Sequence, residues 1–168
     1  MYEQAVATAL ELVATYGVVV LLLAFALEGA FVGKLIPTRA LFVGTVLSLG
    51  TDTVGIASVF LATVVGATLG QLLVFGVVRW TDLSIAALPG SHGPTGGGRL
   101  HGWFDRWGLP AVAVSNAMPL ARGSLTVPAA MNDAGVVRFS SAAVVGTATY
   151  AGGLVAVAAG MDVLLALA

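Results

Sequence analysis

Charged residues divide the chain into long apolar intervals. Leu12–Gly33 contains a single charge, Glu28, whereas Thr53–Val78 and Phe139–Met161 contain none. These intervals are 22, 26 and 23 residues long. A helix rising about 1.5 Å per residue needs roughly 20 residues to cross a hydrocarbon core of about 30 Å. The pattern therefore predicts three transmembrane helices over these ranges.

Two more apolar segments, Gly29–Gly50 and Leu109–Met131, are interrupted by prolines and charges. Proline removes a backbone donor and clashes with the preceding turn, so straight helices are not expected there. Broken backbone at membrane depth is tolerated only where protein or a wet cavity surrounds it. We therefore predict two re-entrant hairpins of broken helices. The prolines are Pro37 in the first segment and Pro110, Pro119 and Pro128 in the second.

Composition supports an integral membrane protein with an all-α polytopic fold, forming a single domain over residues 1–168. Hydrophobic residues make up 58% of the chain and charged residues 9%, which is too few to cover the surface of a soluble domain. The net charge is −1 and there is no basic stripe, so nucleic acid is not an expected partner. With no cysteine, the chain has no disulfide framework.

The polar segment over residues 80–108 is the predicted central loop, and its end, Arg99–Trp107, suits a short helix at headgroup level. Arg79, Arg99 and Arg106 border or lie within this loop, whereas no Lys or Arg precedes Lys34. The positive-inside rule then places the central loop in the cytoplasm. Because two of the predicted crossings precede this loop, the N-terminus is also expected to be cytoplasmic. The two hairpins would enter from opposite sides, as in the inverted repeats of transporters.

Four charges lie within the apolar segments: Glu28, Lys34, Arg39 and Arg122. Ionisable groups at membrane depth are costly and often mark a substrate or ion pathway. We expect Glu28 and Arg122 to form the centre of a polar site, with arginines that can hold phosphate oxygens. The alternative is that Lys34 and Arg39 extend to the headgroups and that Glu28 and Arg122 form a structural ion pair.

Several uncharged polar residues are weaker candidates. Asn116 stands six residues before Arg122 and can turn toward the same site. Gln71 and Tyr150 are expected to form hydrogen bonds between helices instead. The histidines His92 and His101 lack ligand spacing, so no metal site is expected. Enzyme motifs are also missing, so we predict neither catalysis nor a cofactor. The remaining candidates are Ser115 and Ser124.

Two loops carry a family resemblance. Asn116-Ala117-Met118-Pro119-Leu120-Ala121-Arg122 resembles the arginine loop of the DedA family, also called SNARE-associated or VTT domain proteins. Glu28-Gly29 resembles the acid that ends the first helix of that family. Leu35-Ile36-Pro37-Thr38-Arg39 is similar to its first re-entrant loop. Further similar segments are Trp103–Gly108, Pro128-Ala129-Ala130, Arg138-Phe139 and Gly146–Tyr150, the last standing for a Gly-x-x-x-Trp motif.

The resemblance implies a polytopic transporter of the cytoplasmic membrane, with two re-entrant hairpins, that flips polyprenyl phosphate or another anionic lipid and depends on a proton gradient. Glu28 would couple or gate, and Arg39, Asn116 and Arg122, with Pro37 and Pro119 shaping their loops, would bind substrate. Arg39 replaces the family's loop acid and Asn116 its first arginine, which puts proton coupling in doubt.

Two other functions fit the same sequence. One is a membrane organiser that moves nothing and uses its charges only for packing. The other is a proton-coupled exporter of small solutes. The expected partners are membrane lipids, and the sequence is compatible with a homo-oligomer.

Overall fold

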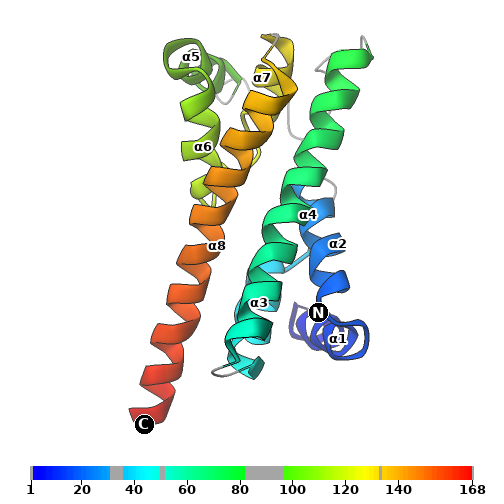
Figure 1. The fold of residues 1–168 in the computed structure, drawn as a ribbon, viewed down its shortest axis with the longest axis vertical. Helices are drawn as coiled ribbons and strands as arrows, with labels where there is room; N and C mark the ends of the chain where they lie inside the picture. The colour runs from blue at the N-terminus through cyan, green and yellow to red at the C-terminus, as the bar shows by residue number, and fades with distance from the viewer. Residues whose placement is uncertain (1, 31–35, 50–51, 82–96, 133, 168) are drawn as a thin grey trace.

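The computed structural model describes residues 2–30, 36–49, 52–81, 97–132 and 134–167, and within these ranges it is helical without strands (Figure 1). This agrees with the predicted all-α class. The helices are α1 (Tyr2–Tyr16), α2 (Val18–Gly29), α3 (Thr38–Leu49), α4 (Thr53–Trp80), α5 (Gly97–Trp107), α6 (Leu109–Ala117), α7 (Thr126–Met131) and α8 (Val136–Leu167).

Among the described residues, α4 and α8 are the two helices long and apolar enough to cross a membrane. They contain 28 and 32 residues, or about 42 and 48 Å at 1.5 Å per residue. They match the helices predicted over Thr53–Val78 and Phe139–Met161. Asp52 caps α4 by accepting a hydrogen bond from the Val54 N–H at 3.1 Å.

The first predicted span, Leu12–Gly33, is wrong as a single helix. The chain breaks at Gly17, whose φ of 65° and ψ of −153° suit a residue without a Cβ atom. The helix after this break, α2, has 12 residues and measures about 18 Å, too short for a crossing. In Figure 1, α1 is seen almost along its axis and lies beside the end where α4 begins.

Short helices flank each long helix. In Figure 1, α2 and α3 lie beside the half of α4 where that helix begins, and α6 and α7 lie beside the half of α8 where that helix begins. The hairpin predicted over Leu109–Met131 corresponds to α6, a turn and α7. The hairpin predicted over Gly29–Gly50 is displaced, because its first arm is α2 and Gly29 is the last residue of that arm.

The helices α1 and α5 lie at opposite ends of α4 (Figure 1). The prediction that the N-terminus and the central loop share a side depends on a crossing by one helix over Leu12–Gly33, and α1 and α2 do not form one helix. The helix predicted over Arg99–Trp107 is present as α5, with Trp103 and Trp107 exposed.

Glycines bring the short helices into close contact with the long ones. A Cβ atom added to Gly70 of α4 would lie 2.0 Å from the Ala26 carbonyl oxygen of α2. On α8, a Cβ atom at Gly146 would lie 2.2 Å from the Ala113 carbonyl oxygen of α6. Small residues permit this close backbone packing, which is common between membrane helices. The contacts fix where each short helix ends along its long neighbour.

Candidate functional site

Local sequence explains how the second loop, between α6 and α7, bends. Met118 is extended, with ψ 126°, as expected for a residue before proline, and this ends α6. Successive tight turns follow, with hydrogen bonds from Ala121 N to Met118 O and from Ser124 N to Ala121 O. Gly123 has a φ of 75°, a value that glycine adopts without strain. The turns place Arg122 at the tip of this loop.

Arg122 and Glu28 meet, as the sequence predicted, although 94 residues separate them. Arg122 Nη1 lies 3.5 and 3.4 Å from the two carboxylate oxygens of Glu28. These distances exceed the roughly 2.7–2.9 Å of a strong charge-assisted hydrogen bond. The side chains are 6% and 20% exposed, respectively. The ion pair is therefore partly buried and loosely bound.

Two aromatic rings hold the Arg122 guanidinium. Its Cζ atom lies 4.5 Å from the ring centre of Tyr150 on α8 and 5.3 Å from that of Phe25 on α2. Both distances fall within the range of about 6 Å for cation–π attraction. Phe25 stands three residues before Glu28, so one face of α2 supplies both contacts. Phe25 was not among the predicted site residues, and its spacing of three residues from Glu28 is the signal that could have identified it.

Arg39 also reaches the second loop. Its Nη2 donates to the Pro119 carbonyl oxygen at 2.7 Å, and its Nε donates to the Tyr150 hydroxyl at 3.2 Å. Each hairpin thus contributes an arginine that contacts the other hairpin or Tyr150. Tyr150 was expected only to link helices, and it does so, but it also contacts both arginines.

Asn116 lies beside this cluster and bonds only to protein groups. Its Oδ1 accepts from the Gly123 N–H at 2.9 Å and from Gln71 Nε2 at 3.2 Å, while its Nδ2 donates to Gln71 Oε1 at 2.9 Å. Both side chains are fully buried. The predicted interhelical role of Gln71 is confirmed, and the geometry favours a structural role for Asn116 over phosphate binding.

Replacing Asn116 with alanine is expected to destabilise the fold by about 1–3 kcal/mol, because the Gly123 N–H and the Gln71 amide lose their buried partners. The measurement is thermal unfolding in detergent. The matched control is Asn132→Ala, since Asn132 is exposed and donates only to Pro128 O, one turn earlier. Equal melting temperatures for the two variants would contradict the structural role of Asn116.

The remaining predicted residues are placed as follows. Pro37 lies directly before α3 and is half-buried, and its carbonyl oxygen accepts from Leu41 N in the first turn. The hydroxyls of Ser115 and Ser124 donate to carbonyls three residues earlier. Lys34, His92 and, as a side chain, His101 lie outside what the structure describes.

Charge in this cluster is unbalanced. Glu28 is the sole acid in residues 12–51, and residues 106–132 and 134–161 contain none. Glu28, Arg39 and Arg122 therefore sum to one net positive charge. Within the described residues, Nη2 of Arg122 is buried without a hydrogen-bond partner. A buried donor without a partner is costly, and a guanidinium edge matches the oxygens of a carboxylate or phosphate. The geometry suits an anionic ligand.

No family model, no curated protein and no solved structure matches this chain.

Proposed function

We propose that the chain is a multi-pass protein of the cytoplasmic membrane built as an inverted repeat. In each half, a helix is followed by a glycine, two short helices and one long helix. The two glycines support this proposal: Gly17 has φ 65° and ψ −153°, and Gly108 has φ 60° and ψ −139°. The halves point in opposite directions in Figure 1. Each half then contributes one re-entrant hairpin and one crossing.

Basic residues orient this proposed topology. Arg79 lies in the last turn of α4, Arg106 in the last turn of α5 and Arg138 in the first turn of α8, and these three helix ends lie at one end of the molecule (Figure 1). Residues 1–33 and 40–78 contain no Lys or Arg. By the positive-inside rule, the α5 end faces the cytoplasm and the α1 end faces outward.

Within this topology, we propose a transporter that moves the anionic headgroup of a lipid, such as a polyprenyl phosphate, across the bilayer. The observation that carries the proposal is the net positive cluster with the unpartnered, buried Nη2 of Arg122. In membrane proteins, such intramembrane charges commonly line substrate pathways. The DedA resemblance of the two loops supports the same function.

The residues take distinct roles in this proposal. Arg122 binds a phosphate oxygen through Nη2, and Arg39 supplies the second positive charge. Tyr150 positions both arginines through its ring and its hydroxyl. Glu28 holds Arg122 loosely between binding events, so an incoming phosphate competes with its carboxylate. It is also the acid available to couple binding to proton movement.

The test is lipid translocation in proteoliposomes. Purified protein is reconstituted with fluorescent phosphate-bearing lipids, and the reagent-accessible fraction is followed over time. We expect translocation above that of protein-free liposomes, with a polyprenyl phosphate competing and a neutral polyprenol not competing. Equal rates with and without protein would contradict transport and favour the organiser. Substrate-driven proton flux that lipids do not inhibit would favour the small-solute exporter.

A further inference from the structure

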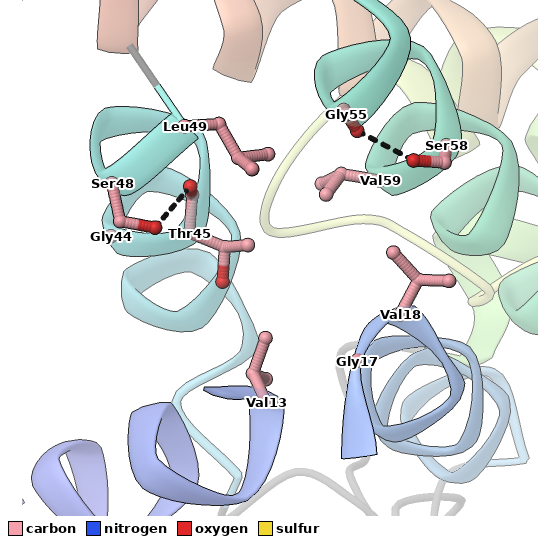
Figure 2. Close-up of a pocket in the computed structure, with 10 residues that line it drawn as sticks. All are labelled: Val13, Gly17, Val18, Gly44, Thr45, Ser48, Leu49, Gly55, Ser58 and Val59. Carbon is pink, nitrogen blue, oxygen red and sulfur yellow. Dashed lines mark hydrogen bonds between the residues drawn. The ribbon is translucent and has the colours of Figure 1, made fainter. Parts of the chain in front are cut away.

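A pocket of about 370 Å³ lies between α1, α2, α3 and the first turns of α4, and none of its lining residues belongs to the charged cluster. Figure 2 shows side chains of α1, α2, α3 and α4 facing it, beside the chain break at Gly17. The lining residues are Val13, Gly17, Val18, Gly44, Thr45, Ser48, Leu49, Gly55, Ser58 and Val59.

The lining of the pocket is chemically apolar. None of its residues carries a charge, and its hydroxyls bond to the backbone of their own helices. Thr45 donates to Leu41 O at 2.7 Å, Ser48 to Thr45 O at 2.7 Å and Ser58 to Gly55 O at 2.8 Å. An ordered water needs two to four polar partners, and apolar cavities instead take apolar ligands. A hydrocarbon chain therefore fits this pocket better than water or a polar solute.

The surface next to the pocket is also apolar. Val18 lines the pocket and is 36% exposed, and neighbouring Val19 and Val54 are 58% and 79% exposed. Val18 and Val19 on α2 and Val54 on α4 are thus exposed apolar residues that lipid would cover in a bilayer. The pocket thus borders on the surface from which an acyl chain would enter.

An acidic group stands beside the pocket. A Cβ atom at Gly55 would lie 2.6 Å from Asp52 Oδ2, so the carboxylate lies close to Gly55, one of the lining residues. Asp52 itself is exposed, and the sequence around this end, residues 1–33 and 40–78, has no Lys or Arg. A lipid bound here meets a negative charge at its headgroup, which favours a headgroup with an ammonium and disfavours an anionic one.

We propose that this pocket binds one acyl chain of a zwitterionic, amine-bearing phospholipid, with its ammonium beside Asp52. This lipid is distinct from the anionic substrate, and the proposed orientation places it in the outer leaflet. The inference depends on the membrane location in the proposed function but not on transport.

The test is photocrosslinking in nanodiscs, using phosphatidylethanolamine with a diazirine in its acyl chain and peptide mass spectrometry. We expect adducts concentrated in residues 44–59. Ser58→Phe fills the pocket and should lower these adducts about tenfold, a loss of about 1.4 kcal/mol of binding. The matched control is Ser141→Phe on α8, since Ser141 is exposed and its hydroxyl also bonds one turn back, to Val137 O.

The headgroup is tested with Asp52→Asn, because asparagine still caps a helix but carries no charge. Wild type should give roughly threefold more adducts with phosphatidylethanolamine than with phosphatidylglycerol, the range of an exposed ion pair, and the variant should not discriminate. Persistent discrimination in Asp52→Asn would overturn the assignment of the ammonium to Asp52. If Ser58→Phe does not fold, Ser48→Phe fills the pocket from α3.

Adducts spread evenly over exposed apolar faces, or unchanged by the filling variants, would overturn the pocket. Arg122→Ala separates the two proposals. It should retain the adducts in residues 44–59 even though lipid translocation is lost. If translocation continues but these adducts are absent, the proposal that the pocket binds lipid is wrong, whereas the transport proposal is not contradicted.

Discussion

Replacing Arg122 with alanine is expected to reduce lipid translocation in proteoliposomes by roughly 30-fold or more. The substitution removes the guanidinium that lies between Phe25 and Tyr150 and pairs with Glu28. Truncating one partner of a buried charge pair costs about 2–5 kcal/mol, and every 1.4 kcal/mol is about tenfold in affinity. The proposed site would then have lost the guanidinium N–H groups that donate hydrogen bonds to the bound anion.

Two further variants make the Arg122 result specific. Arg122→Lys keeps the charge but loses the planar fork and much of the stacking, so translocation should be low rather than restored. The control is Arg138→Ala, because Arg138 is exposed in the first turn of α8, about three turns before Tyr150. Full translocation by a folded Arg122→Ala protein would contradict the site. Thermal unfolding in detergent establishes that the variant is folded.

Replacing Gly70 with alanine is expected to lower the free energy of unfolding by about 1–3 kcal/mol or more, the usual range for overpacking. The added Cβ atom would lie 2.0 Å from Ala26 O and 2.8 Å from Ala30 N, and both are backbone atoms that cannot rotate away. Helix α2 would have to move from α4, which displaces Glu28 at its last turn. The measurement is the melting temperature in detergent, together with translocation.

The matched control for Gly70→Ala is Gly152→Ala on α8. Gly152 is also helical, but nothing lies within 4 Å of its added Cβ atom. Alanine there should leave stability unchanged or raise it by up to about 1 kcal/mol through helix propensity. A Gly70→Ala protein as stable as Gly152→Ala would show that α2 and α4 do not pack as described.

Charge spacing along the chain was enough to predict the long helices α4 and α8 and the ion pair between Glu28 and Arg122. The intervals 53–78 and 139–161 carry no charge, so a helix is the one structure that satisfies their backbone in a bilayer. Glu28 is the sole acid in residues 12–51, which leaves few partners for an arginine at the same depth. The observed contact between Glu28 and Arg122 at 3.4 Å agrees with this small number of acids.

Other features depend on geometry that residue type alone does not specify. Gly17 interrupts an apolar run with a positive φ, and the run reads equally well as one unbroken helix. Tyr150 contacts Arg39 and Arg122 only because α8 passes both the start of α3 and the segment between α6 and α7. Asn116 lies near Arg122, as predicted, yet its side-chain amide forms hydrogen bonds with Gln71 and Gly123. Each of these outcomes is decided by packing between segments distant in sequence.

Native mass spectrometry of the detergent-purified protein tests most directly whether the buried cluster holds a phosphate. The account predicts that wild type retains a phosphate-bearing lipid and that Arg122→Gln, purified in the same way and equally stable, does not. Retention of the same lipid by both proteins, or of neutral lipids alone by wild type, would contradict it.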